Sequence, residues 1–324
     1  MSCMCVLKHE EQVRGQSAME YLMTYGWAIL IIAIVLVALF SLGVFNGANF
    51  APKASPGSCQ VFRPYGPGTT QDINLEGECT NQLPKYVAIF SPSGSDTAWG
   101  GGLINVSITS ANNVSNSGEF TFTGWIYNTN PNIQNAGIFG DGGVWLGPYT
   151  KGFFTGVYSG GYLMGLAGDN YNGIVSTPPC CTSSYIPVDS WIFFAVTFNE
   201  ASGKANLYIS SKSGLVNFTN TITGQNIAPA GGAGYAIGSE NVQGFNSWTG
   251  MISDIQLYNS TLSANDINSI YLEGIGGVPV DILHIVGWWP LNGNGNDYSG
   301  NNANGVATTN VLYTNDWSAN YNPP

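Results

Sequence analysis

The residue types that carry out enzyme chemistry are scarce in this sequence. Histidine occurs only twice, as His9 and His284, so a histidine-based metal site or catalytic triad is disfavoured. His284 lies within an apolar run, DILHIVGWW, and we expect it to be a core or strand histidine. Glycoside hydrolysis uses two carboxylates that flank the scissile bond, whereas Asp254 stands alone in its predicted strand. We therefore predict that the protein is not an enzyme.

Two other groups of side chains are candidates for ligand binding. The run from Asn292 to Asn304 contains Asp297 and many amide oxygens, which suit a hard cation such as Ca²⁺. The same run also fits a solvated turn that is held by its own hydrogen bonds. Four aromatic residues that lie among glycines could stack on sugar rings, although packing within strands is the commoner role of such residues. They are Trp145, Tyr149, Tyr158 and Tyr162.

The composition excludes several classes of protein. Charged residues make up 8% of the chain, against roughly 25% in an ordinary soluble domain, which excludes a coiled coil and a charge-rich disordered chain. Lys and Arg total 8 and Asp and Glu total 19, so the net charge is −11 and no basic face for nucleic acid is expected. Aromatic residues make up 13%, which is enough to fill a sizeable core.

An apolar run near the N-terminus is the first element that the sequence predicts. No residue from Tyr21 to Pro52 is charged, and Leu22 to Phe45 supplies 24 residues, where a membrane helix needs about 20. A buried core helix is a poor alternative, because the run is apolar on every side. A cleaved secretory signal has a shorter apolar stretch followed by a small-residue site, and no clear site follows here. We predict a transmembrane helix.

The residues before this helix resemble a known leader. A basic residue and Gly15 precede Gln16, and a cut between them would make Glu20 the fifth residue of the mature chain. This pattern resembles the class III signal peptide of archaeal type IV pilin-like proteins, whose prepilin peptidase cuts before the apolar helix. The resemblance implies a leader at 1–15, a helix at 16–45, and a Glu20 that neutralises the N-terminal amine of a neighbouring subunit during filament assembly. An uncleaved signal anchor is the alternative.

Residues 46–85 are rich in Gly, Pro, Asn and Ser and are predicted to be a linker. Apart from Cys3 and Cys5 in the leader, four cysteines remain, and an even number in an exported chain predicts disulfides with three connectivities. They are Cys59, Cys79, Cys180 and Cys181. A Cys59–Cys79 bridge would close a short loop and is preferred, which leaves the adjacent pair as a vicinal disulfide or two free thiols. A zinc site is disfavoured, because neither CxxC spacing nor a nearby histidine supports it.

Four Asn-x-Ser/Thr sequons permit glycosylation of an exported chain, although they do not prove it. Their asparagines are Asn105, Asn113, Asn217 and Asn259. The leader, the cysteines and the sequons together place the part of the chain after the helix outside the cell. We expect a single-pass protein of the cell membrane with an extracellular C-terminal domain.

The exterior part consists of short apolar or aromatic runs that are separated by Gly, Asn and Ser turns. Residues 120–127 (FTFTGWIY) alternate with period two, and residues 191–198 (WIFFAVTF) reach 205–210 through a short turn, which is a hairpin signal. Ser263, with Asp266 three residues on, is the predicted N-cap of a short helix. Short strands with regular turns predict a β-sandwich.

The order of these pieces resembles the LamG-like jelly roll of the concanavalin A-like lectin/glucanase superfamily. The resemblance covers about Phe120 to Gly274 and is most specific in WTGMISDIQLYNSTLSANDINSIYLEG. It implies a mainly-β sandwich at 86–318 and a tail at 319–324. Residues 287–300 (GWWPLNGNGNDYSG) resemble the opening of such domains yet close this chain, so either the fold is permuted or a second module is cut short.

The apolar residues of this closing segment need burial, and we expect its strand to complete the sandwich. They are Ile282, Ile285, Trp288 and Leu291. The combined prediction is a membrane-tethered or pilus-associated surface protein whose sandwich serves adhesion or carbohydrate recognition. Its expected partners are the membrane, the prepilin peptidase, further copies of the chain and extracellular glycans, but no nucleic acid. A structural filament subunit without glycan binding is the alternative, and a glycoside hydrolase is less favoured.

Overall fold

The chain divides into two units, Met1–Lys53 and Ala54–Pro324, which are described separately. A computed structural model describes these residues: 23, 25–37, 83–91, 100–141, 152–158, 162–167, 174–176, 186–222 and 234–324.

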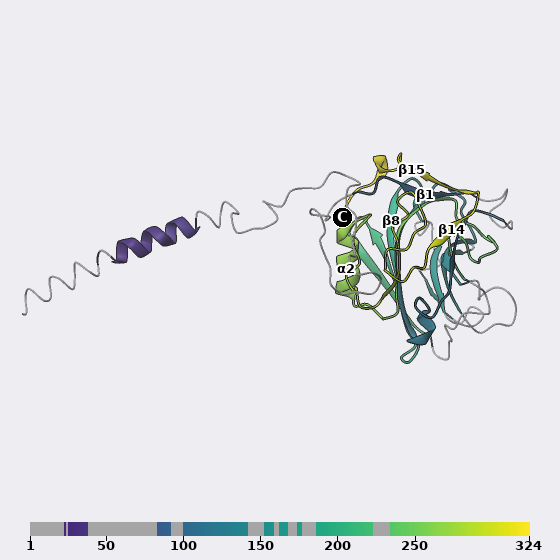
Figure 1. Cartoon of the computed structure of the whole chain (residues 1–324), viewed down its shortest axis with the longest axis horizontal. Coiled ribbons are helices and arrows are strands. Elements are labelled where there is room, and N and C mark those ends of the chain that lie inside the picture. The colour runs from purple at the N-terminus through teal and green to yellow at the C-terminus, as the bar shows by residue number, and fades with distance from the viewer. Residues whose placement is uncertain are drawn as a thin grey trace, which may run out of the picture. The chain divides into compact units, whose positions relative to one another are not determined.

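The described part of the first unit is a helix that includes Met23 and residues 25–37, drawn in purple in Figure 1. Its large apolar side chains are exposed within the chain. The predicted helix at 16–45 extends beyond the described residues on both sides. Among the residues that the structure describes, no helix is both long enough and apolar enough to cross a membrane.

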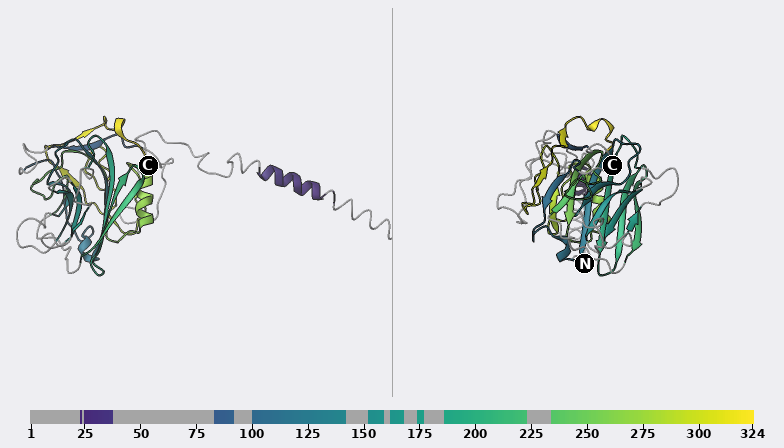
Figure 2. Two further views of the ribbon diagram at one scale, coloured as in Figure 1. Left: turned by 180° about the vertical axis from the view of Figure 1, so that it is seen from behind. Right: turned by 90° about the vertical axis from the view of Figure 1, so that its right-hand side faces the viewer.

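The second unit is a mainly-β sandwich of two antiparallel sheets (Figures 1 and 2), as the sequence predicts. In the described residues the first sheet has the order β10-β9-β8-β3-β12-β1-β15, with β13 also paired to β12. The second sheet has the order β14-β2-β11-β4-β5-β6-β7. The strands of the first sheet are β1 (Val87–Phe90), β3 (Glu119–Asn128), β8 (Trp191–Asn199), β9 (Lys204–Ser211), β10 (Gly214–Thr221), β12 (Gly250–Tyr258), β13 (Ile285–Trp289) and β15 (Val311–Thr314). The strands of the second are β2 (Ile104–Ser107), β4 (Ala136–Gly140), β5 (Phe153–Tyr158), β6 (Tyr162–Ala167), β7 (Ile174–Ser176), β11 (Gly234–Ile237) and β14 (Gly305–Ala307).

The main core lies between the two sheets and is rich in phenylalanine. Alternate residues of β3 point into it, so Phe120 and Phe122 are buried against the facing strands. The ring of Phe122 stacks on Phe139 of β4 with centroids 4.1 Å apart, and Phe120 stacks on Phe153 of β5 at 4.5 Å. Such stacked pairs contribute beyond simple area burial. The alternation of apolar residues with period two therefore determines which face of the sheet packs against the other sheet.

A second apolar layer covers the outer face of the first sheet. It is built by helix α2 (Ala264–Glu273) and by the C-terminal residues, including the short 3₁₀ helix η3 (Ser318–Asn320). A capping box between Ser263 and Asp266 starts α2, which confirms the predicted N-cap. The aromatic ring of Tyr271 then packs on Trp125 of β3 with centroids 6.1 Å apart. Because both faces of β3 are covered, every residue from Phe120 to Asn128 is buried.

The C-terminal segment contributes strands to both sheets. β13 and β15 pair with β12 and β1, while β14 pairs with β2 of the other sheet. Ile285, Trp288 and Leu291 are buried, as expected for a strand that completes the sandwich. Ile282 is wrongly expected to be buried, because it lies 41% exposed in the turn before β13.

His284 also differs from its prediction as a core or strand histidine. It lies just before β13, its side chain is 50% exposed, and its Nδ1 is 2.7 Å from an Asp281 oxygen. The carboxylate of Asp281 also accepts from the backbone N–H of Leu283 and His284. Ile282, Leu283 and His284 therefore lie in a turn and not in β13. The hydrogen bonds of the Asp281 carboxylate stabilise this turn in competition with strand pairing.

Candidate functional site

The outer face of the second sheet, at strands β4, β5 and β6, is the region of the two predicted aromatic residues whose backbone the structure describes, Tyr158 and Tyr162. Phe153 and Val157 of β5 and Leu163 of β6 point into the core. Tyr158 is the last residue of β5, and Tyr162 is the first residue of β6. Their Cα atoms are direct partners at the β5–β6 turn. The structure therefore brings Tyr158 and Tyr162 together, as a pair of neighbouring positions at one end of this face.

Three glycines make the floor of this outer face. Gly137, Gly140 and Gly156 have no side chain, and neighbouring groups use the space where a Cβ would lie. The ring of Phe154 lies against Gly140 and Gly156, and the backbone at Glu240 lies against Gly137. The loop after β11 can therefore rest directly on β4, which it also joins through a hydrogen bond from the Gly137 N–H to the Asn246 carbonyl oxygen.

This loop carries a buried carboxyl group that the sequence analysis did not single out. Glu240 is 3% exposed, and its Oε2 accepts a hydrogen bond from Asn246 Nδ2 at 2.5 Å. Desolvation by burial raises the pKa of Glu240 to about 8, although the hydrogen bond from Asn246 acts in the opposite direction. The other oxygen, Oε1, and the Asn246 Oδ1 are both buried and have no hydrogen-bond partner among the described residues.

Two buried acceptor oxygens of this kind are unusual, because most such atoms are paired. They are oxygen ligands of the type that Ca²⁺ accepts, but Ca²⁺ takes six to eight of them. No group of three or more His, Cys, Asp or Glu side chains that could hold a metal ion occurs in the described parts of the chain. A polar loop after a strand, SENVQGFNS, is the only sequence signal that could have drawn attention to Glu240.

Asp297, the predicted calcium ligand, organises the loop between β13 and β14 through hydrogen bonds. Its Oδ1 accepts from the backbone N–H groups of Trp288 and Ser299, at 2.9 and 2.8 Å. Its Oδ2 accepts from the Ser299 hydroxyl and from the Ala303 N–H, at 2.8 and 2.9 Å. These four donors occupy lone pairs that a cation would need, so the arrangement is that of a hydrogen-bonded turn. The calcium site stays a prediction.

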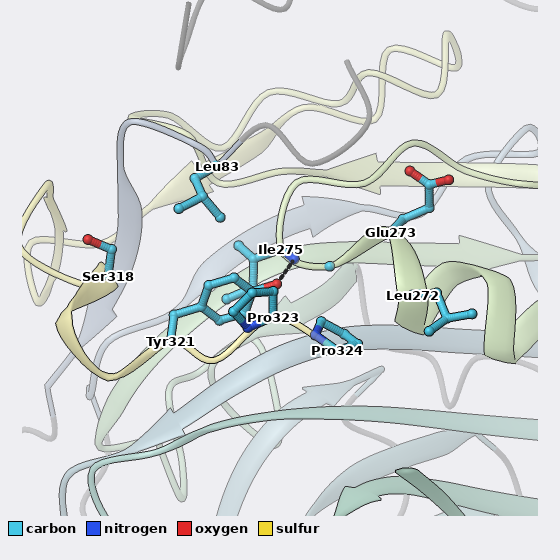
Figure 3. Close-up of a pocket in the computed structure, with 9 residues that line it drawn as sticks. Leu83, Leu272, Glu273, Ile275, Ser318, Tyr321, Pro323 and Pro324 are labelled. Carbon is cyan, nitrogen blue, oxygen red and sulfur yellow. Dashed lines mark hydrogen bonds between the residues drawn. The ribbon is translucent and has the colours of Figure 1, made fainter. Parts of the chain in front are cut away.

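A groove lies at the C-terminal end of α2 (Figure 3). Its volume is about 330 Å³, and most of its lining is apolar: Leu83, Leu272, Ile275, Tyr321, Pro323 and Pro324. The hydroxyl of Tyr321 accepts a hydrogen bond from the Ile275 N–H at 3.0 Å. Gly274 makes this approach feasible, because its φ of 76° suits glycine and a Cβ would collide with that hydroxyl.

The chemistry of this groove is limited. Glu273 is the one carboxylate among its described lining residues, and partial burial raises its pKa. Hydrolysis of a glycosidic bond needs a second carboxylate within about 5–10 Å. The groove can therefore hold a small apolar or amphipathic group, but its described lining does not supply an acid and base pair.

Asp254 is a structural carboxylate inside the second apolar layer. It is 1% exposed, and it accepts hydrogen bonds from Trp288 Nε1 at 2.9 Å and from Gln256 Nε2 at 3.3 Å. Tyr258 in turn donates to the Oε1 of Gln256 at 2.5 Å. Desolvation raises the pKa of Asp254 to about 7, against the effect of these hydrogen bonds. Asp254 is not among the residues that line the groove, although its charge interacts with Glu273 and Tyr321, which are; its raised pKa reflects burial at a strand junction.

The four sequons lie in different surroundings. Asn105 is exposed on β2, and Asn217 is exposed on β10. The Oδ1 of Asn113 caps the short 3₁₀ helix η2 (Val114–Asn116), where it accepts from the Ser115 N–H and hydroxyl. The Oδ1 of Asn259 is buried.

Several predicted residues fall outside the described residues and stay predictions. They are Gly15, Gln16 and Glu20 of the leader and helix, the cysteines Cys59, Cys79, Cys180 and Cys181, and the aromatic residues Trp145 and Tyr149.

Comparison with protein families gives one match. A family described as the concanavalin A-like lectin/glucanases superfamily (Laminin_G_3) matches residues 100–268, which is just over half of the chain. This range runs from the turn before β2 into helix α2, and it contains the outer face with Glu240. A comparison with curated proteins finds no match.

Solved structures show a similar fold at low sequence identity. A candidate carbohydrate-binding protein from Bacteroides ovatus aligns with a TM-score of 0.50 at 17% identity, over 72% of this chain and 60% of its own. This chain thus matches about three fifths of that relative's length. A heptameric SAP-like pentraxin from Limulus polyphemus gives a TM-score of 0.45 at 16% identity, over 71% of this chain and 94% of its own. The CBM40 module of a Ruminococcus gnavus sialidase, solved with α2,3-sialyllactose, gives a TM-score of 0.29 at 13% identity, over 68% of this chain and 95% of its own.

Proposed function

We propose that this chain, which belongs to the concanavalin A-like lectin/glucanases superfamily, recognises carbohydrate through its sandwich domain and does not cleave it. The family match over residues 100–268 is the observation that carries the proposal. The pairing of Tyr158 with Tyr162 at the β5–β6 turn supports it, since aromatic residues at two neighbouring positions suit stacking on the flat face of a sugar ring.

Binding without cleavage follows from the acids near this face. A retaining glycosidase holds two carboxyl groups about 5–5.5 Å apart, and an inverting one about 6.5–9.5 Å apart. Glu240 is a buried residue of the loop after β11, and one of its oxygens is hydrogen-bonded to Asn246. A buried carboxyl group with a pKa of about 8 is protonated at neutral pH, and its one hydrogen bond, from Asn246, lies within the loop after β11.

A neutral glycan suits this surface better than an acidic one. The net charge of the chain is −11, and it stays at that value without residues 1–15, because two basic and two acidic residues leave together. A negatively charged surface repels polyanions at low ionic strength. Flat aromatic contacts bury modest area, so the affinity of one site should be weak, and display of many copies would raise avidity without new contacts.

The proposal extends to the way in which the domain is displayed. The leader pattern at Gly15, Gln16 and Glu20 and the apolar run after it support a pilin-like, membrane-tethered surface protein that a prepilin peptidase processes. In that arrangement the helix anchors the chain in the membrane or in a filament, and the sandwich lies outside the cell. Mass spectrometry of the mature protein tests this part, and we expect a chain that begins at Gln16.

The binding proposal is tested with the mature protein in detergent against a panel of neutral and acidic polysaccharides. We expect weak binding of a neutral polysaccharide, and loss of that binding when Tyr158 and Tyr162 are both replaced by alanine. Tyr298→Ala is the matched control, since Tyr298 is an exposed tyrosine in the loop after β13. Parallel measurements with a chelator test the calcium prediction, because removal of a bound ion should lower the melting temperature.

Two results would contradict the binding proposal. The first is retention of binding by the double tyrosine variant, which would move the site away from this face. The second is failure to bind any glycan together with ordered filaments of the mature protein, which would favour a structural subunit. Release of reducing sugar from a bound polysaccharide would instead identify a glycoside hydrolase.

A further inference from the structure

The edge strand β10 is an exposed surface that the proposed function does not use. All eight of its residues pair with β9, and no described strand pairs with its other side. Most of its side chains are exposed, and its sequence, GLVNFTNT, contains neither charge nor proline. Phe218 is partly buried and packs against the main core.

A long uncharged edge strand of this kind favours aggregation. Its free N–H and C=O groups can pair with a strand of another molecule, and natural proteins prevent this with lysine, proline, bulges or a cover. Here the basic residues lie only at the two ends, with Lys204 opposite Thr221 and Lys212 in the turn before β10. The centre of the strand carries Asn217 instead, within the sequon Asn217-Phe218-Thr219.

We propose that Asn217 carries an N-linked glycan and that this glycan shields the edge of the first sheet. The Asn217 side chain is exposed and forms no hydrogen bond with the described residues. Asn217 pairs with Tyr208 of β9, and it shares the outer face of the sheet with Leu215, which packs on the second apolar layer. A sugar on Asn217 would therefore stand on the outer face at the middle of β10, and its bulk would overhang the edge at which a second strand would have to dock.

The chemistry is a group transfer. A bond forms between Asn217 Nδ2 and the anomeric carbon of the sugar, and the amide nitrogen loses one proton. The anomeric carbon–oxygen bond to the donor breaks, and the phosphate of a polyisoprenyl-linked oligosaccharide leaves with the electron pair. The donor and its transferase come from the cell, so the inference rests on the exterior location in the proposed function.

The other three sequons are less suited to this transfer. Asn105 lies on β2, which is hydrogen-bonded to β14 on one side and to β11 on the other, so the strand cannot bend away from the sheet without losing two ladders. The amide oxygen of Asn113 accepts two hydrogen bonds from Ser115, and that of Asn259 is buried. β10 loses only one ladder when it bends, because it is an edge strand.

The experiment uses the mature protein purified from its own cells, with peptide mapping and intact mass. We expect a hexose-containing adduct on the peptide that contains Asn217 and its absence in Asn217→Gln. Asn220→Gln is the matched control, because Asn220 is exposed on the same strand but lies outside a sequon. In sedimentation velocity, Asn217→Gln should form larger assemblies than the wild type and Asn220→Gln do at the same concentration. The added association should come from pairing of sandwich domains at the unshielded edge.

The outcomes separate this inference from the proposed function. A mature chain that begins at Gln16 and has an unmodified Asn217 overturns the glycan inference and leaves glycan recognition intact. A glycan on Asn217 whose removal causes no added self-association overturns the shielding role. A chain that retains residues 1–15 and has an unmodified Asn217 overturns both the exterior location and this inference.

Discussion

Replacing Glu240 by glutamine should remove a large part of the pH dependence of the sandwich's stability. Desolvation raises the pKa of Glu240 from 4.5 to about 8, and the hydrogen bond from Asn246 only partly opposes it. Between these two values the folded protein keeps a proton on Glu240 that the unfolded chain has released. The stabilising contribution is therefore complete below pH 4.5, decreases as the pH rises, and is lost above about pH 8.

The magnitude follows from the size of this window. One pKa unit corresponds to about 1.4 kcal/mol, so the free energy of unfolding should fall by about 3 kcal/mol between pH 5 and pH 8 through this group alone. For a domain of this size that loss lowers the melting temperature by roughly 6–12 °C. Glutamine has nearly the same shape and keeps an oxygen for Asn246, but it cannot ionise. The variant should therefore be more stable than the wild type at pH 8.

Urea unfolding of the mature protein at pH 5, 6, 7 and 8 measures this effect. Glu200→Gln is the control, because Glu200 is an exposed acid in the turn between β8 and β9. Asp254, whose pKa is also raised to about 7, should leave a residual slope in the Glu240→Gln profile. If the profiles of Glu240→Gln and wild type run parallel over this range, Glu240 is not protonated on folding and the reasoning fails.

Three further changes test the sandwich itself. Trp288→Phe removes the donor to the buried Asp254 and should cost about 1–3 kcal/mol above pH 7. Trp248→Phe should cost less in urea unfolding, because its indole N–H has no described partner to lose. Ser263→Ala breaks the capping box and should lower the free energy of unfolding by about 1 kcal/mol in the same assay. A smaller decrease in Asp266→Ala would contradict a reciprocal cap. Truncation at about residue 280 removes β13, β14 and β15 and should abolish soluble expression; a soluble, cooperatively unfolding fragment would refute this.

Local sequence patterns were sufficient to predict the central strands and the helix. The predicted strand at 120–127 corresponds to β3 (Glu119–Asn128), and the strand at 191–198 corresponds to β8 (Trp191–Asn199). Both are long runs whose apolar residues face two buried layers, so their pattern is strong. The N-cap at Ser263 is equally local, because a capping box involves residues three positions apart.

The candidate site was harder to predict, because it depends on contacts between distant segments. Glu240 acquires its raised pKa only when the loop after β11 lies on Gly137, about a hundred positions earlier. A glycine in a sequence does not reveal which segment will use the space it leaves. The edge position of β10 is likewise a property of the whole sheet order, and its polar sequence resembles that of a turn-rich segment.

Asp254 shows how one residue can link two strands that a local pattern treats as separate. The first half of β12 pairs with β1, and its second half pairs with β13, with a register irregularity between Ser253 and Gln256. Asp254 lies at this irregularity with φ of 51°, a conformation that Asp tolerates better than most residues. Its N–H donates to the Pro290 carbonyl oxygen at 3.3 Å, and its carboxylate accepts from the Trp288 indole. The acid that stands alone in its strand thus ties the C-terminal segment to the sheet.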